Sequence, residues 1–183
     1  MTRVPTNLEA WLADEAAVRA RIDAGVGPGV NDPATLIDVS GLELMQAMLR
    51  GERPTPPIAH TLDFLIVEVT RGRAIFQGTP RREHLNPLGT VHGGWFATLL
   101  DSALGCAVHT TLPAGRAYTT AELSVKLVRA ITPKVQRVRA IGEVVHSGRQ
   151  LATAEARLVG PDGTLYAHGS TTCLVFEARP ASR

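Results

Sequence analysis

The stretch Gly93-Gly-Trp-Phe-Ala-Thr-Leu-Leu-Asp-Ser-Ala-Leu-Gly-Cys-Ala-Val-His109 decides how this chain folds. Its apolar residues recur in adjacent pairs every four positions, which indicates an α-helix. At the helical rotation per residue they cover roughly 220° of the circumference, about twice the apolar stripe of an ordinary surface helix. We therefore expect a helix from about Gly93 to His109 that is wrapped by other elements instead of lying on a surface.

A narrow face of the same helix lacks large side chains. It holds Gly94, Thr98, Asp101 and Gly105, so an acidic residue lies among small ones. Small residues let a second backbone or a ligand come close. This face is the first candidate for a functional site.

Runs with a period of two lie on both sides of the helix, and such alternation is typical of half-buried strands. Two runs precede the helix and four follow it: residues 62–69, 74–79, 121–127, 138–144, 152–158 and 165–176. Parallel strands need crossover helices, and no helical pattern separates the later runs, so the sheet should be mostly antiparallel. The predicted fold is α+β, with a long central helix wrapped by a curved sheet of about six strands.

The first part of the chain has a helical pattern instead. Residues 6–23 have a helical period, and a second helix is expected to begin at Ser40. The proline-rich segment Arg53-Pro-Thr-Pro-Pro57 then ends that helix. We predict an N-terminal helical extension over residues 1–57, serving as a lid or packing layer, and a main domain over residues 58–183.

Composition narrows the function classes. The 183 residues are 44% hydrophobic and 20% charged, as in ordinary soluble domains, and the net charge is +2. Because there is no dense basic stripe and aromatic residues make up only 4%, a nucleic-acid partner is not expected. No apolar run approaches the length of a membrane span, so no membrane partner is expected either.

Cysteine usage and the start of the chain indicate the compartment. Cys106 and Cys173 lie in apolar stretches, which predicts free thiols in a reducing environment. The first residues lack a secretory pattern. We therefore predict a cytoplasmic protein with no metal, since no cluster has metal-ligand spacing.

Asn86-Pro-Leu-Gly-Thr-Val-His-Gly-Gly94 leads into the central helix and carries the candidate chemistry. The amides of Gly93 and Gly94 open the helix, where backbone donors are unsatisfied and the helix dipole is positive. Such amides can stabilise a carbonyl oxygen under attack. Asp101, about two turns further on, suits the role of general base or nucleophile.

The spacing of these groups predicts how the site is assembled. Gly93 and Asp101 are eight residues apart, which is ~12 Å along a helix axis. Both must reach one carbonyl centre, and on a single helix they cannot. The site should therefore combine Gly93 of one subunit with Asp101 of another, in a symmetric dimer with two sites.

The motif of residues 86–94, the aspartate at position 101 and the later Tyr118-Thr-Thr-Ala-Glu-Leu-Ser-Val125 resemble the hotdog-fold thioesterases of the phenylacetate-pathway (PaaI) type. The resemblance covers roughly residues 40–176. It implies the hotdog fold, hydrolysis of an acyl-CoA thioester without a cofactor other than the coenzyme A of the substrate, and a homodimer or a homotetramer built as a dimer of dimers.

The resemblance also implies roles for single residues. Asp101 is similar to the family carboxylate that activates water or attacks the thioester, and Gly93 to the amide that polarises its carbonyl. His92 matches a histidine that supports this carbonyl site, and Asn86 an asparagine that positions the water or the carbonyl. Thr120, with Thr119 as the alternative alignment, lies where relatives carry a Ser or Thr that holds the water.

Two further residues are expected to contact the coenzyme A part of the substrate. They are Gly94 and Arg149, the latter lying where relatives use a basic residue near the phosphates. The acyl group itself is not predicted. Helix residues such as Trp95, Phe96 or Leu99 are expected to line the acyl pocket.

Two other functions remain open from the sequence. A hotdog hydratase or dehydratase would pair a His with an acid, but His92 here precedes the glycine pair. A non-catalytic acyl-CoA sensor or carrier would bind the thioester without turnover. A DNA-binding sensor is disfavoured because residues 1–50 carry four arginines against seven acidic residues.

Overall fold

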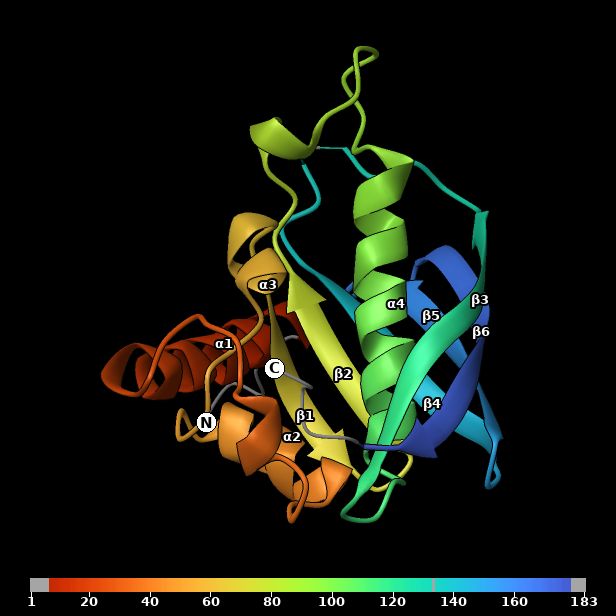
Figure 1. Cartoon of the computed structure of the whole chain (residues 1–183). Helices are drawn as coiled ribbons and strands as arrows, with labels where there is room; N and C mark the ends of the chain where they lie inside the picture. Colours follow the sequence, from red (N-terminus) through yellow and green to blue (C-terminus); the bar gives the residue numbers. More distant parts are fainter. Residues whose placement is uncertain (1–6, 133, 179–183) are drawn as a thin grey trace, which may run out of the picture.

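The computed structural model describes residues 7–132 and 134–178. One antiparallel sheet of six strands curls around the central helix α4, Gly93–His109 (Figure 1). The strand order is β1-β2-β4-β5-β6-β3. The strands are β1 Phe64–Thr70, β2 Arg73–Gly78, β3 Arg116–Leu127, β4 Val138–Ser147, β5 Leu151–Val159 and β6 Leu165–Glu177. The predicted α+β class, helix and sheet are confirmed.

The sheet approaches α4 closely because its inner face carries small residues. On β5 the inward positions alternate with exposed ones and are mostly alanines: Ala152, Ala154, Ala156 and Leu158. Gly142 on β4 lies directly against the helix backbone, where a Cβ would be 2.3 Å from the carbonyl oxygen of Ala103. The eight apolar positions of α4 that recur in pairs are all buried, as the sequence pattern predicts.

Three helices precede the sheet. They are α1 Asn7–Ala24, α2 Gly41–Leu49 and α3 Pro57–Thr61. Ser40 caps α2 in a reciprocal pair of hydrogen bonds with Glu43, as expected from the sequence. None of the described helices is long and apolar enough to span a membrane.

The short helix α3 corrects the sequence prediction. A strand was expected from residue 62, but Leu62 is the C-cap of α3 and β1 begins at Phe64. Pro57 is pre-organised for the first turn of a helix, and this local preference overrides the alternation that follows it. The other difference is β3, which begins at Arg116 instead of near residue 121.

Helix α1 packs on the outer face of the sheet, away from α4 (Figure 1). Gly78 on β2 faces Leu99 of α4. Because adjacent strand residues point to opposite faces, the neighbouring Gln77 points away from α4, toward α1. The Gln77 side chain donates to Glu15 of α1 at 2.7 Å and to the carbonyl of Trp11 at 3.1 Å. The N-terminal helix is therefore a packing layer on the sheet.

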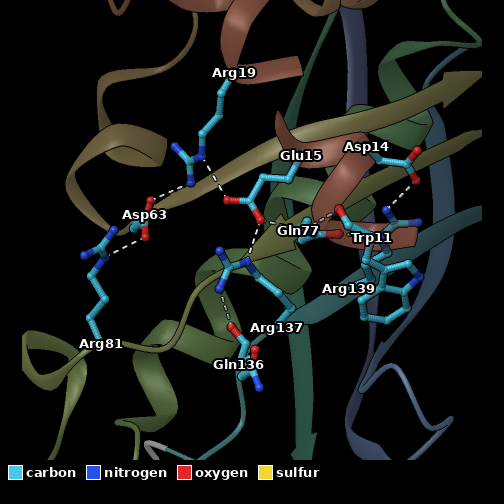
Figure 2. Close-up of polar contacts among 10 residues, drawn as sticks. All are labelled: Trp11, Asp14, Glu15, Arg19, Asp63, Gln77, Arg81, Gln136, Arg137 and Arg139. Carbon is cyan, nitrogen blue, oxygen red and sulfur yellow. Dashed lines mark hydrogen bonds and ion pairs between the residues drawn. The ribbon is translucent and has the colours of Figure 1, made fainter. Parts of the chain in front are cut away.

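Glu15 is the centre of the polar contacts that hold α1 (Figure 2). It is only 5% exposed and also accepts hydrogen bonds from Arg19, at 2.9 Å, and from Arg137. Burial would raise the pKa of Glu15, but the hydrogen bonds from Arg137, Arg19 and Gln77 outweigh it and lower that pKa. The carboxylate is therefore ionised and fully paired.

Candidate active site

Asp101 lies half-buried on α4 and is held by the edge strand β3. Its Oδ1 accepts a hydrogen bond of 3.1 Å from the hydroxyl of Thr120. Thr119, the alternative alignment, is exposed instead. The structure thus brings together two of the residues expected at the site, and it distinguishes Thr120 from its neighbour.

A β-bulge in β3 explains why Thr120 points toward the helix. The register with β6 shifts between Thr120 and Glu122. Before the bulge Tyr118 faces α4, and after it the odd-numbered Val125 and Leu127 do. A bulge adds one residue and so re-aims the side chains on one side of it. Without this shift, the alternation seen from residue 121 onward would turn Thr120 away from Asp101.

The helix face around Asp101 is closed toward its C-terminal end. A Cβ on Gly105 would lie 2.7 Å from the hydroxyl oxygen of Tyr118, so the phenol ring rests on this glycine. Burial, with a smaller contribution from Asp101, raises the pKa of Cys106 to about 12. Cys106 is therefore a neutral thiol, and it is unsuited to act as a nucleophile.

Tyr118 was not singled out by the sequence as a site residue. Its ring packs against that of His109 at the end of α4, with 5.3 Å between the ring centroids and the planes tilted by 52°. Burial raises its pKa well above the usual value, and Cys106, Cys173 and Asp101 add to that rise. Its spacing of two from Thr120 on one strand was the available signal, since both positions precede the bulge and share a face.

The N-terminus of α4 has one free amide and one that is occupied. His92 is the N-cap, and its Nδ1 accepts a hydrogen bond of 2.9 Å from the amide of Gly94. No residue within 7–132 or 134–178 accepts a hydrogen bond from the amide of Gly93. Gly93 is therefore the available donor at this helix end, and Gly94 is engaged within the cap.

Asn86 organises the loop that leads to this helix end. Its Oδ1 accepts from the amides of Leu88, at 2.9 Å, and of Thr90, at 3.3 Å. Its Nδ2 donates to the Thr90 hydroxyl at 2.9 Å. Leu88 at the loop tip is 90% exposed. The geometry gives Asn86 a structural task in this loop, and its expected role toward substrate stays a prediction.

Within one protomer the expected site residues form two separate groups. Asp101 and Thr120 make one group, and His92, Gly93 and the Asn86 loop make the other. Since α4 is one continuous helix, the Gly93 amide and Asp101 are ~12 Å apart along its axis. The two groups cannot act on one carbonyl of a single-protomer substrate complex.

Arg149 belongs to the far end of the molecule. It is exposed in the turn between β4 and β5, and its carbonyl accepts a hydrogen bond from Arg116. The preceding Ser147 contacts Thr111, just beyond the C-terminus of α4, at 2.8 Å between hydroxyl oxygens. Within the protomer, Arg149 thus lies at the opposite end of α4 from Gly93.

Trp95, Phe96 and Leu99, which were expected to line an acyl pocket, are core residues. All three are buried between α4 and the sheet. Trp95 also donates to the carbonyl of Leu62 at 2.9 Å, which ties the helix to the segment before β1. Their burial gives them a packing role, and the expectation that they line an acyl pocket stays a prediction.

Comparisons with known proteins agree with this architecture. Residues 88–167 match the sequence profile of the family described as the Thioesterase superfamily. A protein of Caenorhabditis elegans, F42H10.6, whose name provisionally assigns it as an esterase, is 31% identical over 120 residues. That match covers 64% of this chain and 69% of the relative.

Three solved structures illustrate the likeness of fold. A phenylacetic acid degradation-related protein from Ralstonia eutropha has a TM-score of 0.66 at 29% identity, covering 72% of this chain and 98% of that one. A point variant of the phenylacetic acid degradation protein PaaI from Thermus thermophilus has a TM-score of 0.58 at 28% identity, and the match covers 64% of this chain and 97% of that one. The PaaI protein of Escherichia coli shares the fold, with a TM-score of 0.64 at 19% identity, and the match covers 78% of this chain and 97% of that one.

A long helix enclosed by a six-stranded antiparallel sheet, with an aspartate on the open helix face, defines a hotdog-fold protein. The chain belongs to the thioesterase superfamily. Its structural neighbours are PaaI-type proteins, as the sequence motif indicates.

Proposed function

We propose that this protein hydrolyses an acyl-CoA thioester to the free acid and coenzyme A, with Asp101 as general base or nucleophile. The observation that carries the proposal is the hydrogen bond from Thr120 to Asp101, on the one face of α4 that the sheet leaves open. A thiolate leaves readily, so an activated water or a carboxylate and a polarised carbonyl suffice. The reaction needs no cofactor beyond the coenzyme A in the substrate.

Gly93 is the proposed oxyanion donor. Its amide points out of the positive end of the α4 dipole and has no acceptor within 7–132 or 134–178. His92 supports this geometry, because its Nδ1 takes up the neighbouring amide of Gly94 and fixes the first turn. Because Nδ1 of His92 is an acceptor, Nε2 carries the proton in the neutral imidazole. Nε2–H is then a second hydrogen-bond donor at this helix end, beside the Gly93 amide.

The catalytic site is proposed to form between two subunits. Helices α1, α2 and α3 all pack against β1 at one end of the strand order, whereas β3 is a long edge strand at the other end. Exposed apolar residues lie on it and just after it: Leu123, Leu127 and Val128. Open, apolar edge strands invite pairing with another chain. A second copy paired on β3 would supply its Gly93 to this protomer's Asp101. By symmetry, this protomer would supply its Gly93 to the Asp101 of the second copy.

The other functions are weighed against the same geometry. A hydratase needs a histidine beside an acid, and no histidine among the described residues hydrogen-bonds Asp101. A carrier would bind the thioester without turnover. A cytoplasmic location fits the proposed substrate and stays part of the proposal.

The test is free-thiol release from a panel of acyl-CoAs by the wild type and Asp101→Asn. We expect the variant to lose about 10²-fold or more in kcat/KM while its melting temperature and assembly stay the same. Glu155→Gln, an exposed carboxylate on β5, is the matched control and should keep full activity. Binding of acyl-CoA without thiol release by the wild type would overturn hydrolysis in favour of a carrier.

A further inference from the structure

A cavity of about 780 Å³ separates the N-terminal extension from the body of the fold. Residues of α1 and α2 line it from the extension, and α3, β1, β2, β3 and the last turn of α4 line it from the body. Its outer wall contains residues 28–31 and 54–57, which are joined by a hydrogen bond of 2.9 Å from Gly29 to Thr55. The volume falls within the range of about 300–1,000 Å³ that is usual for small-molecule sites.

The inner wall of this cavity is apolar. Its large side chains come from two helical turns of α2 and from the inner face of β1 and β2: Leu44, Met45, Met48, Phe64, Ile66 and Phe76. Two methionines on one wall make it adaptable in shape, because the side chain is unbranched and polarizable. Such a wall suits an extended hydrocarbon or aryl group.

The two arginines that line the cavity both pair with one carboxylate at its rim. Arg19 and Arg81 both bind Asp63, at 2.7 and 2.6 Å. His84 and His109 also line the cavity. Burial lowers the pKa of both imidazoles, so they carry no charge at neutral pH. The described lining therefore offers no unpaired buried cation that could bind a carboxylate at the far end of a ligand.

One end of the cavity lies near the proposed catalytic carboxylate, since Asp101 acts electrostatically on both Cys106 and Tyr118. Cys106, His109 and Tyr118 line that end. Cys106 lies five residues after Asp101 on α4, and Tyr118 lies two residues before Thr120 on β3. No residue within 7–132 or 134–178 hydrogen-bonds the Tyr118 hydroxyl, although its ring is packed against Gly105. An opening at Tyr118 would let a group in the cavity extend to Asp101.

We propose that this cavity receives the acyl group of the thioester, that the preferred substrates carry an uncharged, extended apolar acyl group, and that Met45 and Met48 of α2 limit its length. The inference rests on the proposed thioester hydrolysis and adds the substrate class. It assigns the N-terminal extension a function in specificity. The lack of an unpaired buried cation in the described lining disfavours acyl groups that end in a carboxylate.

The test is kcat/KM over straight-chain acyl-CoAs from acetyl to palmitoyl, with succinyl-CoA added. The wild type should prefer uncharged chains longer than acetyl over succinyl. Met48→Trp fills the cavity and should lower the ratio of decanoyl- to butyryl-CoA turnover by about tenfold or more. Gln46→Trp, on the same helix but outside the cavity lining, should leave that ratio unchanged. Met48→Ala, which enlarges the cavity, should move the preference toward longer chains and covers the case in which the tryptophan variant does not fold.

The outcomes separate this inference from the proposed function. If hydrolysis depends on Asp101 but neither Met48 variant changes the chain-length profile, the cavity does not bind the acyl group and the proposed function stands. A wild type that prefers succinyl-CoA contradicts the substrate class in the same way. If no acyl-CoA is hydrolysed, the proposed function fails and this inference fails with it.

Discussion

The Thr120 hydroxyl donates a hydrogen bond of 3.1 Å to Asp101 and so joins the edge strand β3 to the central helix. The contact orients the carboxylate, and no residue in the described part of the chain hydrogen-bonds its second oxygen, which a water or a substrate could therefore reach. A bulge directly after Thr120 makes the contact geometrically accessible. Strand irregularity and helix position together prepare the carboxylate for the proposed reaction.

Removing the Thr120 hydroxyl should slow the reaction without unfolding the protein. Thr120→Val keeps the shape of the side chain but leaves Asp101 without its protein donor. Hydrogen bonds to charged groups contribute about 1.5–3 kcal/mol, so we expect a loss of about tenfold or more in kcat. Steady-state kinetics of thiol release measures the effect.

Two control variants make this prediction specific. Thr120→Ser retains the donor and should keep most of the activity. Thr119→Val changes the exposed neighbour and should have no effect. Equal losses in the serine and valine variants would show that the hydroxyl contact is irrelevant.

The Gly93 amide can be removed with little disturbance of the helix. Gly93 is the first residue of α4, a position where proline is favoured because the N–H there has no partner in the helix. The preceding His92 has φ −63° and ψ 137°, a conformation that a following proline accepts. Gly93→Pro should therefore lower kcat by about 10²–10³-fold, as expected for loss of an oxyanion donor.

Gly93→Ala is the matched control for this substitution. Both variants add a Cβ 3.0 Å from Cδ1 of Leu127, a flexible side-chain end, but only the proline removes the N–H. The alanine variant should keep much more activity than the proline variant at an unchanged melting temperature. If the two variants lose the same activity, crowding and not the amide is responsible.

Glu15 should be the main polar determinant of α1 docking. Glu15→Ala leaves Gln77 and Arg137 without their acceptor at a buried position. We expect a loss of about 3 kcal/mol in the free energy of unfolding, which is the lower end of the range for breaking a buried ion pair. The lower end applies because Arg19 and Arg137 keep some access to water. Asp23→Asn, an exposed carboxylate on the same helix, should change little in the same urea titration.

The same network gives the protein an acid sensitivity. Burial raises the pKa of Glu15 and of Asp63, but hydrogen bonds from arginines outweigh it and lower both values. A carboxyl whose pKa is lower in the folded state stabilises the fold above its unfolded pKa, and this contribution is lost as pH falls through the folded pKa. Stability should therefore drop in the acidic range, and Glu15→Gln should flatten that dependence. An unchanged slope in urea titrations at several acidic pH values would contradict the assignment.

The contact of β4 with α4 provides a test of the fold itself. Gly142→Ala would place a Cβ 2.3 Å from the Ala103 carbonyl oxygen, in a place where only backbone can move. Overpacking of this kind costs about 1–3 kcal/mol or more, so the melting temperature should fall clearly. Gly163→Ala, at a surface turn with no atom nearby, should cost less, through its φ of +82° alone.

Much of the fold could be predicted from the sequence because strong periodicities specify it. The paired apolar residues of α4 and the alternating alanines of β5 face the same core, and each pattern is visible locally. Helix α3 was missed because five residues are too few for a period to appear. Pro57 at its start was interpreted as a boundary only.

The site was predicted in part for a similar reason. The motif at residues 86–94 and Asp101 could be found by resemblance and helix spacing, and Thr120 could be placed only to within one residue. The bulge that decides between Thr120 and Thr119 depends on pairing with β6, which no local pattern encodes. Tyr118 and the α2 methionines come to line one cavity only through tertiary packing.

The central claim is that Gly93 and Asp101 act together across two subunits, and mixing inactive variants tests it most directly. Asp101→Asn and Gly93→Pro would be co-expressed with different affinity tags, and assemblies carrying both tags would be isolated. In a mixed dimer, one of the two sites joins the intact Gly93 of one subunit to the intact Asp101 of the other, and the second site carries both substitutions, so the isolated mixed dimers should regain about half of wild-type thiol release. Mixed assemblies as inactive as either parent would contradict the shared site.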